Sequence, residues 1–365
     1  MFDQDILYAN HYEKQVGELN KEKLYKGIDY KTFIKNDLNY LDSNVVHYWH
    51  HNKVKHEIKY SNFYDDSEFM YYYPMNKIME EMDYQDDDLP ITPELQLFHD
   101  EFTKAFTLIE LNGIGVNTNI ISTFGHRMAQ YIHDRKIYQN YNFYTTTSRP
   151  SNSINNLNFA ALTPEHRECF SPLNDIFIEF DFDAYHPRLI GDLIGYEFPN
   201  TSVHEYLSSK YKVDISEGKT KTFQYLYGGI PNDVANKIEF LNMTKNLISE
   251  MWDEFNQNKR INSHIYNRPM KDENLENLNA QKLFNYYIQS YETERNVKLL
   301  MKLHTYLLTK KTNIVHYNYD SFLFDYSKED GVETIHEIKQ ILEKNGFTTK
   351  TKVGSDYGNI KNYGF

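Results

Sequence analysis

The feature that most constrains this chain is a strand-like segment that runs directly into a helix, at residues 176–195 (IFIEFDFDAYHPRLIGDLIG). Every second residue from Ile176 to Phe182 is apolar, which is the period-two pattern of a half-buried β-strand. Pro187 is tolerated only in the first turn of a helix, so we expect a helix to begin near it. Asp181 then lies where the strand ends, at a junction where side chains and backbone carbonyls converge.

A second carboxylate stands in a predicted β-hairpin at residues 313–326 (NIVHYNYDSFLFDY). Two strand-like apolar runs flank a polar turn, with Asp320 at its tip and Asp325 further along the second strand. Read alone, an aspartate such as Asp181 or Asp320 is more often a solvated turn residue or a helix cap. Together, two carboxylates on separate β elements are able to hold two Mg²⁺ ions about 3.5–4 Å apart, since Mg²⁺ prefers oxygen ligands and leaves coordination positions for phosphates.

The third informative segment is residues 219–229 (KTKTFQYLYGG), a predicted helix that ends at the glycine pair Gly228-Gly229. Lys219, Phe223 and Tyr227 are four residues apart and therefore share one helical face. An amphipathic core helix would account for the aromatic residues, but not for a lysine in the same stripe. A lysine is able to neutralise triphosphate charge and to protonate a departing pyrophosphate, while an aromatic ring offers a flat face to a base.

In this order, the three segments resemble motifs A, B and C of the family A DNA polymerases, the group of bacterial DNA polymerase I and several phage replicases. The matching residues are Asp181 and Arg188 for motif A, Lys219, Phe223, Tyr227 and Gly228 for motif B, and Asp320 for motif C. Further matches outside the motifs are Gly113, Ile114 and Val116, Thr147, Arg149, Ser151, Asn156 and Leu157, Arg167 to Phe170, and Asn285 with Gln289. The resemblance covers roughly residues 105–365, and its specificity comes from the ordered set.

The resemblance implies a role for each matched position. For catalysis and metal binding it implies Asp181 and Asp320, with Lys219 as a catalytic cation and Phe182 as a further metal neighbour. For the incoming nucleotide it implies Phe182, His186, His204, Phe223 and Tyr227. For the primer and template it implies Arg149, Asn156, Arg188, Arg268, Asn285 and Gln289. The implied cofactor is a pair of Mg²⁺ ions, which Mn²⁺ is able to replace.

The implied fold is α+β, a right-hand polymerase with an antiparallel palm sheet and helical fingers. The expected regions are an N-terminal helical region with an acidic linker (1–104), a reduced thumb (105–146), palm (147–195), fingers (196–260) and palm again (261–365). The implied activity is template-directed extension of a primer 3′-hydroxyl with dNTPs, in phage genome replication. With a reduced thumb and no recognisable exonuclease pattern, we expect low processivity, no proofreading, and help from a processivity factor or a separate exonuclease subunit.

Several departures from the family pattern leave two alternatives open. His186 stands where the family has a glutamate that blocks the ribose 2′-hydroxyl, so we expect a preference for deoxynucleotides that is less strict. Ile215 replaces a phosphate-binding arginine, and Ser321 follows Asp320 where a glutamate is usual. One alternative is an enzyme that incorporates ribonucleotides, as a primase or RNA polymerase does. The other is a non-catalytic DNA-binding scaffold derived from a polymerase.

Charge and composition limit the class of protein further. The net charge of −13 argues against a simple DNA-binding module, but residues 64–101 alone contribute −11, which leaves −2 for the rest. Lys310-Lys311 and Lys350 with Lys352 then remain candidates for following a DNA backbone. A lone cysteine, Cys169, fits a reducing cytoplasm, that of the host if the protein is phage-encoded. No apolar run is long enough to predict a membrane span.

The first hundred residues carry weaker patterns, for which we favour the plainer interpretation. Asp66-Ser67-Glu68 has the form of an exonuclease D-x-E motif, and the histidines of residues 47–51 invite a metal hypothesis. Neither pattern is accompanied by the other ligands that such a site needs. The tyrosines of residues 71–73 are able to stack on single-stranded bases, but core contacts are the more common use of such residues.

Overall fold

The structure is a computed structural model, and it describes residues 93–121, 132–133, 135–139, 141, 147–150, 157–199, 201–271 and 278–364. Asn156 and the motifs of the first 92 residues lie outside these ranges. The described chain combines helices with sheets that are antiparallel, an α+β arrangement.

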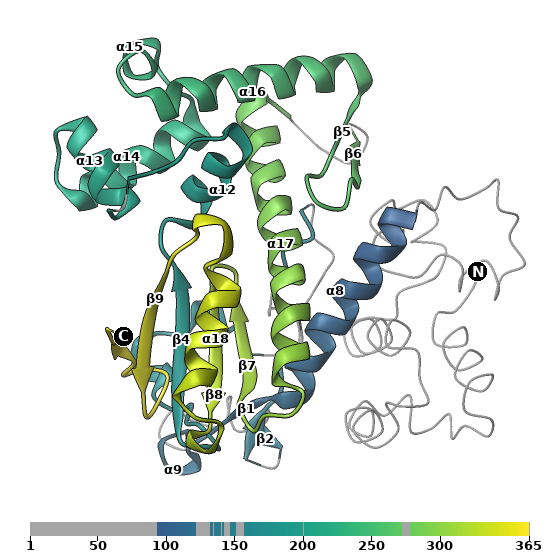
Figure 1. Ribbon diagram of the computed structural model, residues 1–365, viewed down its shortest axis with the longest axis vertical. Coiled ribbons are helices and arrows are strands. Elements are labelled where there is room, and N and C mark those ends of the chain that lie inside the picture. Colours follow the sequence, from purple (N-terminus) through teal and green to yellow (C-terminus); the bar gives the residue numbers. More distant parts are fainter. Residues whose placement is uncertain are drawn as a thin grey trace, which may run out of the picture.

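The centre of the fold is a five-stranded antiparallel sheet with the strand order β10-β9-β4-β8-β7 (Figure 1). Its strands are β4 (Ile176–Phe182), β7 (Asn313–Asn318), β8 (Ser321–Tyr326), β9 (Thr349–Gly354) and β10 (Lys361–Asn362). The predicted strand and hairpin are both confirmed. The expectation that the strand is half-buried is wrong: β4 pairs with β8 on one side and β9 on the other, and residues on both of its faces are buried.

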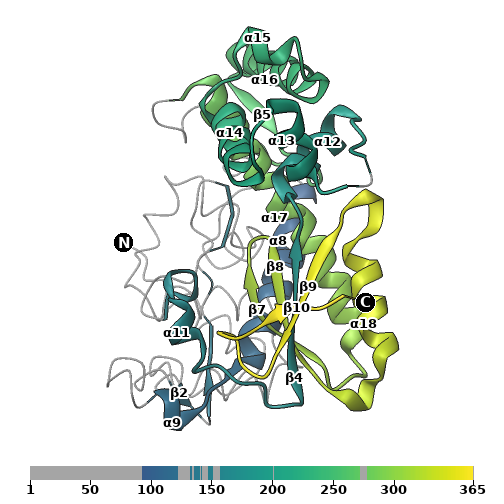
Figure 2. The same cartoon turned by 90° about the vertical axis from the view of Figure 1, so that its left-hand side faces the viewer.

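The sheet is covered on both faces, by layers of different size. One face carries the main hydrophobic core, which includes Phe180 and Phe322 and extends to helices α8 (Pro93–Asn112), α17 (Ala280–Leu307) and α18 (Val332–Leu342). The other face carries a smaller core around Phe177 and Leu323. Figure 2 shows α18 on one side of the sheet and the short elements α9, β2 and α11 on the other. The short elements near the smaller core are β1 (Ile114–Gly115), α9 (Thr118–Ile121), β2 (Ile132–His133), β3 (Lys136–Ile137), η4 (Phe159–Ala161) and α11 (Pro164–Arg167).

A group of helices stands at one end of the sheet, and α17 runs from this group along the sheet (Figure 1). The group comprises α12 (Tyr185–Ile194), α13 (Val203–Tyr211), α14 (Ile215–Gly228), α15 (Asn232–Ala235) and α16 (Glu239–Asn258). A small hairpin, β5 (Arg260–Asn262) and β6 (Pro269–Lys271), follows α16, and two 3-10 turns, η6 (Lys328–Asp330) and η7 (Lys344–Gly346), flank α18. The predicted helix ends are confirmed, since α12 stops at Gly195, which has φ +65°, and α14 stops before Gly229.

The expected boundary at residue 104 falls inside α8 rather than between two regions. Phe98 is fully buried, and its ring packs edge-on against that of Tyr266, with 4.9 Å between the ring centroids. The residues from Pro93 to Lys104 therefore belong to the same packed body as the sheet. None of the helices in the described ranges combines the length and apolarity that crossing a membrane requires.

Candidate active site

Strand pairing brings the two predicted carboxylates to the same end of the sheet. Asp181 lies opposite Ser321 in the β4–β8 ladder, and the backbone N–H of Phe182 donates to the carbonyl of Asp320 at 2.8 Å. Asn318 pairs with Ser321, so the hairpin tip is a two-residue turn, shorter than the four polar residues in the sequence suggested. Asp320 is thereby held next to the end of β4.

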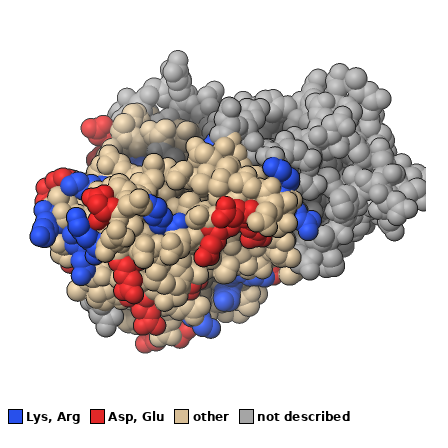
Figure 3. Space-filling view, turned by 90° about the horizontal axis from the view of Figure 1, so that it is seen from above, with Lys and Arg blue, Asp and Glu red and all other residues tan. Residues whose placement is uncertain are grey.

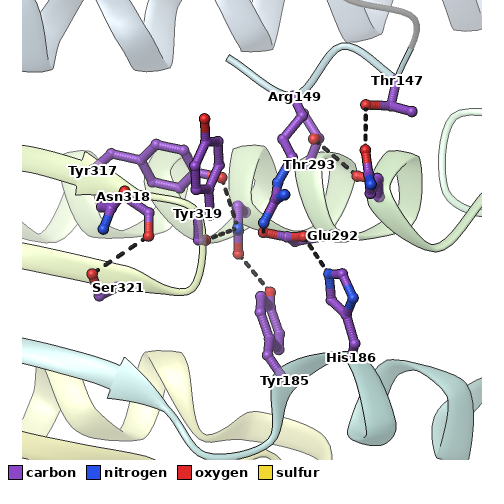
Figure 4. A network of polar contacts seen from close by, with 12 residues as sticks. Thr147, Arg149, Tyr185, His186, Glu292, Thr293, Tyr317, Asn318, Tyr319 and Ser321 are labelled. Carbon is purple, nitrogen blue, oxygen red and sulfur yellow. Dashed lines mark hydrogen bonds and ion pairs between the residues drawn. The ribbon is translucent and has the colours of Figure 1, made fainter. Parts of the chain in front are cut away.

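The tip of this hairpin is strained and is fixed by its neighbours. Tyr319 has φ +56°, a left-handed conformation that costs a non-glycine residue about 1 kcal/mol. The Asn296 side-chain amide donates to the Tyr319 carbonyl at 2.7 Å, and the Arg149 guanidinium lies 3.8 Å from the centroid of the Tyr319 ring. Figure 4 shows Tyr319 among these contacts. The surroundings over-determine the turn and so fix the position of the adjoining Asp320.

A cavity of about 450 Å³ opens over the two carboxylates. The predicted residues that line it are Asp181, Phe182, His186, His204, Lys219, Phe223, Tyr227, Arg149, Asn285, Gln289 and Asp320. They come from the sheet, from α12, α13, α14 and α17, and from the segment that contains Arg149. On α17, the Gln289 amide donates to the Asn285 side chain at 3.0 Å, as expected of residues one turn apart. Tertiary structure thus gathers most of the candidate residues around one space.

Close packing of α13 and α14 sets the position of the wall that carries Lys219. A Cβ atom added at Gly218 would lie 1.9 Å from the hydroxyl oxygen of Ser208, so only glycine allows this approach. Asp214 caps the start of α14 by accepting from the backbone N–H of Glu217 at 2.9 Å. Along the inner face of α14, the rings of Phe223 and Tyr227 are nearly parallel, with centroids 6.2 Å apart.

Loss of hydration and nearby negative charge raise the pKa of Asp320 to about 6. The largest cause is loss of hydration at the base of the cavity, although the residue keeps access to solvent, and repulsion from Asp181 and Glu292 adds to it. Asp181 is partly neutralised, because the Lys352 ammonium lies 2.7 Å from Asp181 Oδ2 and 2.8 Å from Glu179 Oε2.

The lysines on β9 form ion pairs that the sequence did not suggest. Lys350 lies 2.6 Å from a carboxylate oxygen of Asp183, and Lys352 bridges Glu179 and Asp181. We predicted that this pair could follow a DNA backbone, but in the structure both ammonium groups face carboxylates of the neighbouring strand segment. Figure 3 shows acidic and basic side chains interspersed on the described surface seen from above, so this face has no field of a single sign.

A polar network joins α12, α14 and α17 below the cavity, and Figure 4 shows its part between His186, Glu292 and Arg149. Glu292 is fully buried, with Oε2 at 2.7 Å from His186 Nε2 and Oε1 at 3.2 Å from the Arg149 guanidinium. The other ring nitrogen of His186 hydrogen-bonds the Tyr227 hydroxyl. Burial by itself would raise the pKa of Glu292, but the hydrogen bonds and charges of His186 and Arg149 outweigh it and lower that pKa below its ordinary value.

Sequence reasoning missed Glu292, although a signal for it exists. Asn285, Gln289, Glu292 and Asn296 follow one another at spacings of four, three and four residues, so they form a polar stripe on one face of the helix. A polar stripe on a helix that is buried along most of its length indicates a site rather than a solvated face.

His204 lines the same cavity from α13 and offers an unsatisfied polar atom. It is only 9% exposed, and its buried Nδ1 has no hydrogen-bond partner within the described part of the chain. Burial lowers the pKa of His204, and the positive charges of Lys219 and Lys350 lower it further against the opposing effect of Asp183. Such a group is available to a ligand that enters the cavity.

Arg188 and Arg268, both predicted to contact the primer or template, lie elsewhere. Arg188 donates to the carbonyls of Asp183 at 2.9 Å and Gly346 at 3.0 Å, and lines a neighbouring cavity of about 930 Å³. Arg268 is 5% exposed, donates to Glu294 at 2.8 Å, and has its guanidinium over the Phe98 ring. Arg268 joins packed segments, and so buried a side chain has no surface to offer a DNA strand.

The side chains of Phe182 and Asp325 make packing and hydrogen-bond contacts within the protein that the sequence did not suggest. The Phe182 ring is buried and stacks on Tyr185, with centroids 4.2 Å apart, so any contact with a ligand or metal falls to its backbone. Asp325 accepts hydrogen bonds from the backbone N–H groups of Leu173 and Asn174, at 2.8 and 3.0 Å. Asp325 thus fixes the loop that contains Leu173 and Asn174, and it is not among the residues that line the cavity.

The donor set at the end of the sheet fits Mg²⁺. Asp181 and Asp320 present hard oxygen atoms, and the pKa of Asp320 is raised by loss of hydration and, in part, by a repulsion from Asp181 and Glu292 that a cation would relieve. Across the described ranges, no three His, Cys, Asp or Glu side chains converge into a metal cluster. A two-carboxylate site suits Mg²⁺, which keeps several waters and takes phosphate oxygens as ligands.

Comparison with known proteins supports the fold at this level. No protein-family model matches the sequence, and no curated protein sequence matches it either. Among solved structures, the chain is similar to the POL domain of Pol1 from M. smegmatis in complex with DNA primer-template and dNTP, with a TM-score of 0.51 and 12% sequence identity. The match covers 97% of this chain and 64% of that one. At this identity the likeness is one of fold, and the chain has a polymerase-like fold.

Proposed function

We propose that this protein is a template-directed DNA polymerase that extends a primer 3′-hydroxyl with dNTPs. The observation that carries the proposal is the cavity in which Asp181 and Asp320 face the Lys219, Phe223 and Tyr227 side of α14. A carboxylate pair opposite a cation and two aromatic rings suits the phosphates, sugar and base of a nucleotide. The likeness of the fold to a domain solved with primer-template and dNTP supports the same proposal.

In this proposal, the five-stranded sheet is the palm and helices α13 to α16 are the fingers. Asp181 and Asp320 hold two Mg²⁺ ions, which supply charge neutralisation and an acidified 3′-hydroxyl when bound. Lys219 binds the triphosphate and donates a proton to the leaving pyrophosphate. His204 donates to a phosphate oxygen, since its buried Nδ1 is otherwise unsatisfied among the described residues. Phe223 stacks on the base, and Arg149, Asn285 and Gln289 face the primer and template from the opposite side.

The test is primer extension on a defined DNA template with Mg²⁺, run with dNTPs or rNTPs for the wild-type chain and for Asp320→Asn. We expect extension with dNTPs, and a loss of at least about 10³-fold in the variant, because one metal-binding carboxylate is gone. Retained binding of the primer-template by the variant separates loss of chemistry from loss of fold. Extension with rNTPs in preference to dNTPs would indicate a ribonucleotide-incorporating enzyme, and binding without any turnover would indicate a scaffold.

A further inference from the structure

The ring of His186 is fixed through both of its nitrogen atoms. Nε2 lies 2.7 Å from Glu292 Oε2, and Nδ1 hydrogen-bonds the Tyr227 hydroxyl. His186 belongs to the first turn of α12, Tyr227 to α14 and Glu292 to α17, so three helices meet at one imidazole. Figure 4 shows the contact between His186 and Glu292. Glu292 has no exposed surface, and its second oxygen is held by Arg149.

Both nitrogen atoms of His186 face a group that is able to hydrogen-bond with them. Burial raises the pKa of Tyr227, so its hydroxyl stays protonated and is able either to donate to Nδ1 of His186 or to accept from it. A hydrogen on Nε2 points at the Glu292 carboxylate, which the hydrogen bonds and charges of His186 and Arg149 keep ionised. With both nitrogens committed, the ring has one orientation and little freedom to turn.

If the proposed function holds, the rigid ring of His186 lies beside the sugar of the bound nucleotide. A nucleotide with its phosphates at Lys219 and the two carboxylates, and its base on Phe223, has its sugar between these groups. His186 lines that same cavity and follows Asp181 by five residues, while Tyr227, to which it is bonded, follows Phe223 by four. Its side chain is 14% exposed, so only an edge of the ring faces the cavity.

We propose that Glu292 is a positioning residue for sugar selection, which holds His186 as a rigid wall beside C2′ of the incoming nucleoside triphosphate. A 2′-hydroxyl meets an imidazole that is unable to swing aside, whereas a deoxyribose fits. The size of the histidine alone predicts looser selection than a glutamate would give. The clamp by Glu292 and Tyr227 makes selection stricter than that expectation.

The test compares two substitutions that keep the length of the side chain. Glu292→Met removes the acceptor, while Glu292→Gln keeps an oxygen that is able to accept from Nε2 of His186. For each protein, kcat and KM are measured in single-nucleotide extension with a matched dNTP and rNTP. We expect Glu292→Met to lower the dNTP-to-rNTP ratio of kcat/KM by about tenfold or more, mainly through a lower KM for the rNTP, and Glu292→Gln to keep it within about threefold.

Two further proteins separate a positioning role from a general structural one. In a His186→Ala background, adding Glu292→Met should leave the ratio unchanged, because Glu292 then has no ring to hold. Tyr291→Phe is the matched control: it removes a hydrogen bond from Tyr291 to Asp192 that also joins α17 to α12, but that lies at the neighbouring cavity. We expect the control to retain the wild-type ratio.

The outcomes are distinct. If Glu292→Met extends the primer with an unchanged dNTP-to-rNTP ratio of kcat/KM, the inference is overturned and the proposed function stands. The same holds if the ratio falls further when Glu292→Met is added to His186→Ala. No extension by the wild-type chain overturns both proposals. Thermal melts show whether each variant folds, and if Glu292→Met does not, Glu292→Asp carries the same expectation, since it keeps a charge near Arg149 but withdraws the oxygen from His186.

Discussion

Asp320 illustrates at the scale of one residue how a functional position works against stability. Its carboxyl group shares a cavity with Asp181 and Glu292, and its pKa is raised from 3.8 to about 6. The folded state thus favours the protonated acid. The protonated Asp320 therefore contributes to the stability of the folded state. This contribution is fully present below pH 3.8 and is lost as the pH rises through about 6, because the folded protein must then carry an additional negative charge.

A pH series of thermal unfolding tests this residue directly. In EDTA, Asp320→Asn should match the wild-type chain near pH 4 and exceed its melting temperature at pH 7.5, because asparagine resembles the neutral acid. Solvent reaches Asp320, so the expected gain is modest, on the order of 2 °C. Adding Mg²⁺ should stabilise the wild-type chain and not the variant. A difference that is the same at pH 4 and pH 7.5 would contradict the assignment.

Lys352 shows why the charges near a residue in the sequence do not identify its partner in the fold. Lys352 is 171 positions from Asp181 in the sequence, yet its ammonium group bridges that carboxylate and Glu179. The lysine looked available for DNA because nothing near it in the chain suggested a partner. Glu179 is buried and Asp181 partly buried on the central strand, so this acidic pair requires a counter-charge, which the neighbouring strand β9 supplies.

At the scale of elements, α14 depends on its contact with α13. The two helices meet where Gly218 packs against Ser208, and the next residue, Lys219, faces the cavity. The approach leaves no room for a methyl group. The sequence of α14 predicts a helix by itself, but the position of its lysine and aromatic rings relative to the sheet follows from this contact.

Gly218→Ala should therefore disturb both stability and nucleotide binding. We expect a loss of about 2 kcal/mol in the free energy of unfolding, from overpacking, and a higher KM for dNTP as α14 is pushed away from the sheet. Urea denaturation and steady-state extension measure the two effects. Gly228→Ala is the matched control for stability in the same helix, because a Cβ there meets nothing within 4 Å. Partial recovery of stability on combining Gly218→Ala with Ser208→Gly would identify the contact as the cause, because the Ser208 Cα, 2.9 Å from the added Cβ, remains.

At the scale of the whole molecule, α17 joins the sheet to the helical group. Its 28 residues pack against α8, α12, α14, α16 and α18, and many of its side chains are fully buried. The helices α13 and α14 pack on each other, and α14 packs on α17. A ligand in the cavity would add a second connection between α14 and the sheet, since the lining residues come from both.

Hydrogen–deuterium exchange tests where the molecule responds to its substrates. With primer-template and the matched dNTP, exchange should slow in residues 203–228 of α13 and α14, while residues 290–300 of α17, already buried, should change little. Asp320→Asn should retain part of this protection, because the nucleotide still binds through α14. A mismatched dNTP serves as the control. Equal slowing along the whole chain would contradict the expectation.

The sequence by itself determined the elements that carry the site. Alternation of apolar residues predicted β4 and the β7–β8 hairpin, proline and glycine marked the ends of α12, and four-residue spacing put Lys219, Phe223 and Tyr227 on one face of α14. These properties are local, because strand and helix periodicity and end signals extend over a few residues. The same patterns located Asp181 at the end of a strand and Asp320 at the tip of the hairpin.

Only the tertiary structure decided which of these groups meet. The pairing of β4 with β8 and β9 placed Asp320 beside Asp181 and gave Asp181 its lysine, and the packing of α17 brought Glu292 to His186 across 106 positions of sequence. It also buried Arg268, which the sequence had suggested as a template contact. Strand order and helix packing depend on contacts between distant segments, and no local pattern in the chain encodes them.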